Sequence, residues 1–179
     1  MPETGIEAKV PTLTEMADAL GLLARPHGPD GRFITWAFNC GADPAFREIR
    51  PCRKIAAEIA LQWRRSEEMA RAAESIVAEL MANTMQHVPM AHDIGSVALV
   101  EASNGSLVVL VHDRSRARPA RRLDDDEERG RGIELVQSLC RSFGGRLEVI
   151  RDMDGRGKCL EAWLGPVLPW PDRGNLPRY

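Results

Sequence analysis

Two runs of alternating hydrophobic residues, joined by Asn104-Gly105, constrain the fold of this chain more than any other feature. The runs are Ser96–Ser103 and Ser106–His112, and both are rich in valine and leucine. Asn and Gly both tolerate positive φ, so an Asn-Gly pair between two such runs favours the tight turn of a β-hairpin. The sequence therefore predicts an antiparallel pair of strands around which the other elements pack.

Further elements are expected on both sides of this hairpin. In chain order they are a strand over Arg32–Phe38, helices from Asp43-Pro44 to about Trp63 and from Ser66 to about Val88, a helix over about Gly132–Phe143, and strands over Arg146–Arg151 and Lys158–Leu164. Gly144-Gly145 suits a left-handed cap on the last helix. The order β-α-α-β-β-loop-α-β-β predicts an α+β fold, a two-layer sandwich of a mostly antiparallel sheet with helices on one face.

The length of 179 residues fits one domain with tails, since single domains commonly have about 100–150 residues. We assign residues 32–166 to the domain. Residues 1–31 are an N-terminal extension with a short helix at Thr14–Leu23, and residues 167–179 are an irregular tail.

Composition excludes several classes of function. The formal net charge of −2 argues against direct, sequence-independent binding of nucleic acid, which needs a basic excess. The four cysteines form no Cys-x-x-Cys pair or Cys/His cluster, which argues against a zinc site. No secretory signal and no apolar run of about 20 residues is present, so we expect a cytoplasmic protein outside the membrane.

The second predicted helix carries polar residues on one face. Glu79, Asn83 and His87 follow each other at intervals of four residues and therefore lie along the same side. An amide oxygen is a hard ligand of the kind that Mg²⁺ prefers, and a carboxylate one turn away is suited to deprotonate a nucleophile that attacks a phosphate. Taken alone, this helix leaves open a solvated face with no chemical role.

Two other features point to a nucleotide. Asp113 follows the strand that ends at His112, where a carboxylate can accept a hydrogen bond from an adenine amino group or simply begin a turn. Gly130-Arg131-Gly132 precedes a helix, and the exposed N–H groups at a helix start favour phosphate. A simple loop-to-helix turn explains that Gly-Arg-Gly segment equally well.

In combination and in this order, these segments resemble the GHKL family of ATP-binding domains, and within it the bacterial anti-sigma-factor serine kinases. The matching stretches are Ile76–His87, Val111–Ser115, Glu128–Val136 and Gly157-Lys158. The resemblance implies that Glu79 is the catalytic base and that Asn83 is the Mg²⁺ ligand. It further implies contacts to ATP from Asn83, His87, Asp113, Ser115, Arg129, Gly130, Arg131, Gly132, Ile133, Lys158 and Cys159.

The sequence also departs from the family pattern. Arg116 and Ala117 follow Ser115 where a second glycine is usual, and Cys159 follows Lys158 in place of a threonine. The segment between the two glycine motifs, which is the ATP lid of the family, contains five arginines and then Asp124–Glu128. An arginine that reaches phosphate and a mobile, self-neutralising loop remain alternatives for it, and charge patterning favours the loop.

The leading hypothesis is an ATP- and Mg²⁺-dependent serine/threonine protein kinase that regulates transcription by phosphorylating an antagonist (anti-anti-sigma) protein. The alternative is a nucleotide-dependent binding module that sequesters a sigma factor or another regulator without catalysis. A detached histidine-kinase domain is less favoured, because the first 31 residues offer only His27 as a phospho-acceptor, and a gyrase-like ATPase would need a second domain. The resemblance also implies a homodimer formed through the first strand and helix.

Overall fold

The structure is a computed structural model, and it describes residues 23–25, 32–39, 46–87, 94–113, 131–151 and 157–167. The strands of this part are β1 (Leu23–Arg25), β2 (Phe33–Asn39), β3 (Ile94–Glu101), β4 (Leu107–Asp113), β5 (Leu147–Arg151) and β6 (Lys158–Leu164). The helices are α2 (Phe46–Gln62), α3 (Glu67–His87) and α4 (Arg131–Ser142).

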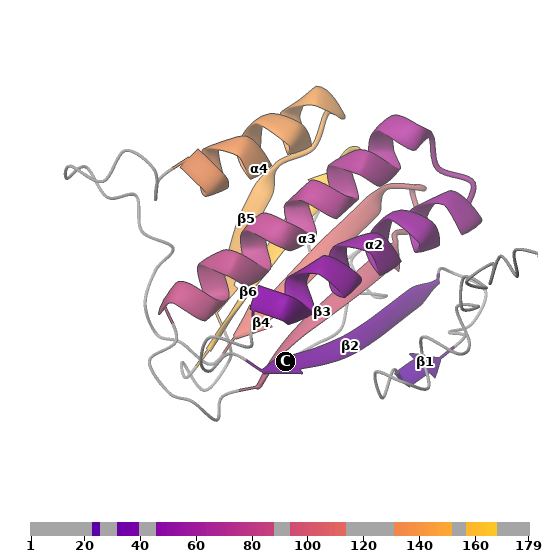
Figure 1. The fold of residues 1–179 in the computed structure, drawn as a ribbon. Coiled ribbons are helices and arrows are strands. Elements are labelled where there is room, and N and C mark those ends of the chain that lie inside the picture. The colour runs from indigo at the N-terminus through magenta and orange to yellow at the C-terminus, as the bar shows by residue number, and fades with distance from the viewer. Residues whose placement is uncertain are drawn as a thin grey trace, which may run out of the picture.

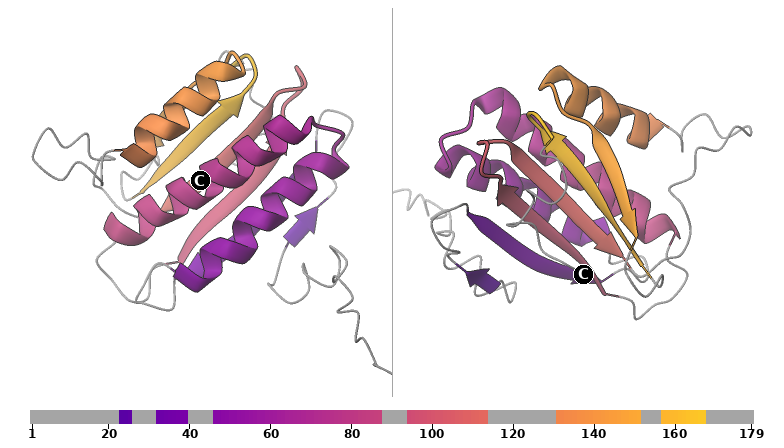
Figure 2. Two further views of the ribbon diagram at one scale, coloured as in Figure 1. Left: turned by 45° about the horizontal axis from the view of Figure 1, so that its top comes forward. Right: turned by 180° about the vertical axis from the view of Figure 1, so that it is seen from behind.

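The strands form one six-stranded sheet in the order β1-β2-β3-β4-β6-β5. Every pair of neighbouring strands is antiparallel. All three helices lie on the same face of this sheet, with α3 between α2 and α4 (Figure 1). Figure 2 shows the same two layers from two further sides. The structure confirms the predicted α+β sandwich.

The β3–β4 hairpin forms as predicted, but its turn differs in detail. Only Gly105 has a positive φ, of 81°. Its N–H donates to the carbonyl of Ala102, while the N–H of Ala102 donates to the carbonyl of Ser106, so three residues make the loop. Asn104 contributes through its side chain, whose Oδ1 accepts a hydrogen bond of 3.1 Å from the N–H of Ser106. The turn is therefore the three-residue type with glycine in the left-handed region.

The alternation along β4 separates two apolar clusters. Leu107, Val109 and Val111 are fully buried against the helices, in a core that also includes α2 and α3. Val108 and Leu110 point to the opposite face, where they pack with Trp163. Because successive strand residues point to opposite faces, this pattern also determines which side of the sheet Asp113 reaches.

The C-terminus of α4 confirms the predicted glycine cap. Gly144 has a φ of +76°. Its N–H donates to the carbonyl of Arg141, and the N–H of Gly145 donates to the carbonyl of Cys140. These two bonds define a Schellman motif. A Cβ at Gly145 would lie 2.0 Å from the carbonyl oxygen of Trp163, so only glycine lets the chain pass this close to β6.

The N-terminal segment differs from the sequence-based expectation. Residues 1–31 were assigned to an extension outside the domain, but Leu23–Arg25 pairs with Phe33–Thr35 and adds an edge strand to the sheet. The expected helix at Thr14–Leu23 lies outside the described residues except for Leu23, which is in β1. Within the described part, the helices are too short or too polar to cross a membrane.

Candidate functional site

The C-terminal half of α3 supplies the first group of site residues. Its buried positions are Ile76, Val77, Leu80, Met81 and Thr84, at the spacing expected of one helix face. Glu79 and Asn83 lie beside this stripe and are partly buried. These two side chains therefore do not lie on a fully solvated face.

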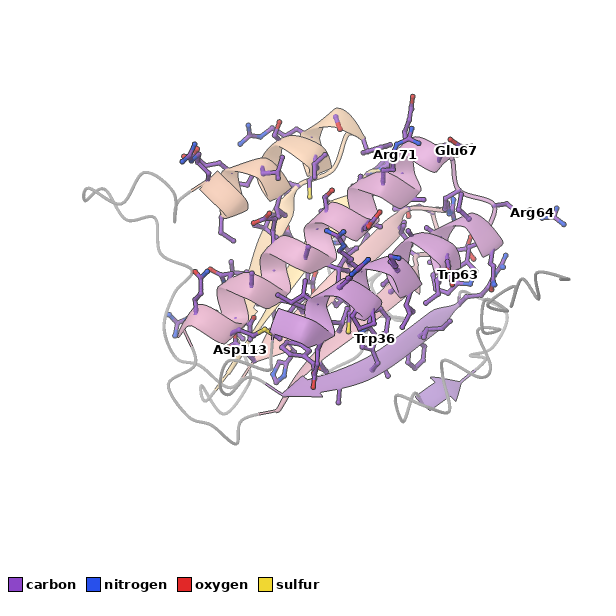
Figure 3. All side chains as sticks on the ribbon, viewed as in Figure 1. Trp36, Trp63, Arg64, Glu67, Arg71 and Asp113 are labelled. Atoms are coloured by element: carbon purple, nitrogen blue, oxygen red, sulfur yellow. The ribbon has the colours of Figure 1, made fainter. Side chains whose placement is uncertain are left out.

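Thr84 connects α3 to the end of β4. Its hydroxyl donates a buried hydrogen bond of 3.3 Å to Oδ2 of Asp113. The carboxylate of Asp113 is 1% exposed, and its Oδ1 lies 3.0 Å from Nζ of Lys158, which is 5% exposed. The carboxylate is thus held by a hydroxyl from the helix layer and by an ammonium group from β6. Figure 3 shows Asp113 at the end of α3 that lies away from Glu67.

The sheet register brings the two charged residues together. Asp113 is the last residue of β4 and Lys158 is the first of β6, and they are directly paired in the β4–β6 ladder. Val111 and Val109 lie two and four positions before Asp113 on β4, and they face the helices. Leu160 and Ala162 lie two and four positions after Lys158 on β6, and they face the helices too. Asp113 and Lys158 therefore face the helix layer as well. A buried charge is costly unless it is paired, so each residue stabilises the other in this position.

Glu79 lies against the start of α4. A Cβ built at Gly132 would lie 2.5 Å from Oε2 of Glu79 and 3.5 Å from its Cδ, so the carboxylate occupies the space that any larger residue would fill. Gly132 is in the first turn of α4. Helix N-termini carry unpaired N–H groups and a partial positive charge, which favours a carboxylate or a phosphate at this position.

One helix thus links the two carboxylates. Glu79 and Thr84 are five residues apart on α3, which corresponds to about 7.5 Å along the helix axis. Glu79 meets the first turn of α4, and Thr84 holds Asp113 at the end of β4. The structure therefore brings together Glu79, Asp113, Gly132 and Lys158 around the C-terminal half of α3.

Cys159 is not part of this group. It pairs with His112 in the ladder and belongs to the apolar cluster on the sheet face opposite the helices. The family resemblance implies that Cys159 and Lys158 both contact ATP. Consecutive strand residues point to opposite faces, so only Lys158 reaches the side of Asp113.

Several expected site residues lie outside the part of the chain that the structure describes. Ser115, Arg129, Gly130 and the lid arginines lie outside the described residues, and so does the side chain of His87. Of the others, Arg131 is exposed at the start of α4, and Ile133 is partly buried against the main core.

The buried thiols are separate from these groups. Burial raises the pKa of Cys52 and of Cys140 to about 11, mainly because the thiolate would lose its hydration. In the ranges that the structure covers, no group of three or more His, Cys, Asp or Glu side chains is arranged to hold a metal ion.

Thr84 is the residue that the sequence analysis missed. No role is expected for it from the sequence, yet its side chain is fully buried and its hydroxyl is hydrogen-bonded to Asp113. Its place one turn after Leu80, on the buried face, was a usable signal, since a buried hydroxyl needs a partner.

Comparison with known proteins agrees with this arrangement. Residues 42–163, which include all the groups described above, match the family model of the histidine kinase-like ATPase domain. A search of the curated proteins found no match to the chain.

Proposed function

The chain belongs to the histidine kinase-like ATPase domain family, which gives it an ATP-binding domain, and from this premise we propose a specific regulatory activity. The proposal is a serine/threonine protein kinase of the anti-sigma-factor type that uses Mg²⁺-ATP to phosphorylate an antagonist protein. The observation that carries this proposal is that α3 positions two carboxylates. Glu79 on α3 lies against the start of α4, and Thr84 on α3 is hydrogen-bonded to Asp113 at the end of β4.

Each carboxylate has a different role in this proposal. Asp113 is held by Thr84 and Lys158 and accepts a hydrogen bond from the base of ATP. The phosphates lie toward the start of α4, where the N–H groups of the first helical turn have no partner within the helix. Glu79 lies beside that turn, at the phosphate end of the nucleotide and at the distance from Asp113 that α3 imposes.

The residues fit a magnesium ion that is bound mostly through phosphate. Mg²⁺ usually keeps several waters and takes one or two protein ligands when it is bound to a nucleotide. The amide oxygen of Asn83 is such a ligand, and it lies one turn along α3 from Glu79. When bound there, Mg²⁺ supplies positive charge that neutralises the phosphate oxygens during transfer.

The reaction requires one proton transfer and one displacement. Glu79 accepts the proton of a serine or threonine hydroxyl of the antagonist. That hydroxyl oxygen forms a bond to the γ-phosphorus as the bond from phosphorus to the bridging oxygen of ADP breaks. The products are ADP and a phosphorylated antagonist. Positioning and charge stabilisation account for most of the catalysis in such transfers, which a small set of side chains can provide.

A kinase assay with a matched control tests this proposal. Transfer of the γ-phosphate to candidate antagonist proteins is measured for the wild type, Glu79→Gln and Glu67→Gln. Glu67 is also on α3 but at its other end, where it pairs with Arg71 at the surface (Figure 3). We expect Glu79→Gln to lose transfer by about 100-fold or more and Glu67→Gln to keep it. Equal activity of Glu79→Gln and wild type would contradict the role of Glu79.

Two departures from the family pattern favour a second function. Arg116 and Ala117 stand where a second glycine is usual, and Cys159 replaces the threonine after Lys158. A module that grips a sigma factor or another regulator in a nucleotide-dependent way needs no turnover. In that case Glu79→Gln leaves partner binding unchanged, and no phosphate transfer is measured even for the wild type. The homodimer and the cytoplasmic location remain predictions.

A further inference from the structure

The buried contact between Lys158 and Asp113 places a hydrogen-bond donor beside the acceptor that the proposed function assigns to the base. Nζ of Lys158 lies 3.0 Å from Oδ1 of Asp113, with exposed fractions of 5% and 1%. A carboxylate only accepts hydrogen bonds, and an ammonium group only donates them. The edge of a ligand that reaches this pair therefore finds a hydrogen-bond acceptor and a hydrogen-bond donor next to each other.

A carboxylate without a neighbouring donor favours adenine over purines with a 6-oxo group. The 6-amino group of adenine donates to it. The 6-oxo group of hypoxanthine or guanine instead presents lone pairs to an anion, which leaves the carbonyl without a hydrogen bond and repelled by the charge. Discrimination of this kind is strong because a buried polar group that loses its partner pays the full cost of its lost hydration.

The ammonium group of Lys158 reduces this preference for adenine, because it adds a donor beside the carboxylate. Adenine has a donor at its 6-amino group and an acceptor at N1, next to each other. Hypoxanthine has the reverse, an acceptor at O6 and a donor at N1. An anion and a cation side by side match either order, because the base donor can turn to Asp113 and the base acceptor to Lys158. We propose that Lys158 is a specificity-determining residue through which the site takes 6-oxo purine nucleotides as well as ATP.

The packing keeps Lys158 in place when a base enters. Thr84 fixes the other oxygen of Asp113 from α3, and the β4–β6 register sets the two charged residues opposite each other. Separating a buried ion pair leaves an uncompensated charge and is strongly unfavourable. A base is therefore expected to bind against the pair and not to displace the lysine. This inference rests on the proposed function, since it requires Asp113 to face the base.

Calorimetric titration with ATP and ITP tests the inference. ITP is the matched probe because its base differs from adenine only at position 6 and in the proton at N1. Both nucleotides are titrated in excess Mg²⁺ into the wild type, Lys158→Met and Lys158→Arg. For the wild type we expect dissociation constants within about tenfold of each other. Lys158→Met should shift the ratio by about 10- to 100-fold in favour of ATP, which corresponds to the loss of one charged hydrogen bond. Lys158→Arg retains a charged donor and should keep the wild-type ratio.

The possible results separate this inference from the proposed function. A wild type that binds ATP more than about tenfold more tightly than ITP overturns the inference, and this measurement needs no variant to fold. An equal gain in affinity for both nucleotides in Lys158→Met would mean that the lysine only obstructs the site, which also overturns it. If the folded wild type and the folded Lys158→Arg variant bind neither nucleotide, the proposed function fails together with the inference.

Discussion

Neutralising one member of the Asp113–Lys158 pair is expected to destabilise the protein far more than neutralising both. Lys158→Met retains the length of the side chain but leaves a carboxylate that is 1% exposed without its cation. Asp113→Asn leaves an ammonium group that is 5% exposed without its anion. Removing one partner of a buried ion pair costs about 3–5 kcal/mol.

The magnitude follows from the depth of the pair in the fold. Because the two side chains are almost fully buried, solvent screens their interaction very little. A loss of about 3–5 kcal/mol lowers the melting temperature of a protein of this size by roughly 6–20 °C. In Asp113→Asn/Lys158→Met no charge is left, and similar changes elsewhere are close to neutral. The two single losses add to about 6–10 kcal/mol, so a nearly neutral double variant implies a coupling energy of about that size, above the range of about 0.5–3 kcal/mol usual for contacting residues.

Urea unfolding of the wild type, both single variants and the double variant measures this coupling. The exposed pair of Glu67 and Arg71 on α3 is the control, with side chains that are 81% and 65% exposed. Exposed pairs at this spacing contribute about 0.3–0.5 kcal/mol, so its cycle should show little coupling. If the Asp113 and Lys158 changes add to within about 0.5 kcal/mol, the two charges do not depend on each other and the reasoning is refuted.

Three further predictions address the glycines and a thiol. In Gly132→Ala, the new Cβ would lie 2.5 Å from Oε2 of Glu79, so this oxygen has to move by about 1 Å. We expect the rate of phosphate transfer to fall about 100-fold, with little change in melting temperature. An unchanged rate would argue against this placement of Glu79. Gly145→Ala should lower the free energy of unfolding by more than about 4 kcal/mol, because its Cβ would be 2.0 Å from a backbone carbonyl oxygen. In Gly144→Ala the new Cβ has no atom within 4 Å, so the loss should be only about 1–2 kcal/mol, from the positive φ. Similar losses for the two variants in urea unfolding would contradict the close approach at Gly145. Burial raises the pKa of Cys140 from 9.0 to about 11, so the thiol loses its proton at lower pH in the unfolded chain than in the folded one. The free energy of unfolding should therefore fall as the pH rises from about 9 to about 11. This decrease should be smaller in Cys140→Ala.

The sequence predicted the regular elements because their signals are local. Alternation and the Asn104-Gly105 pair located the central hairpin, and Lys158–Leu164 was predicted with the bounds that the structure gives. Gly144 marked the end of α4 because a residue with positive φ is usually glycine. The three-residue strand β1 was missed, since a segment this short has no periodicity to detect and exists only through its pairing with β2.

The candidate residues could be named from the sequence, but the contacts between them could not. Glu79, Asp113 and Lys158 were named from their motifs. The hydrogen bond from Thr84 to Asp113 and the ion pair from Lys158 to Asp113 join residues 29 and 45 positions apart in the chain. Contacts at such distances depend on how α3 packs on the sheet and on the register of β4 with β6. Neither is encoded in a local pattern, and the same register carries Cys159 to the other face.

Calorimetric titration of ATP, with and without Mg²⁺, examines the ATP site itself. The proteins are the wild type, Asp113→Asn and, to keep the buried charges balanced, Asp113→Asn/Lys158→Met. We predict Mg²⁺-dependent ATP binding by the wild type, and its loss or a weakening of about 100-fold in both variants, because the proposed acceptor for the base is removed. Absence of ATP binding by the folded wild type, or equal affinity in the variants, would contradict an ATP site built around Asp113.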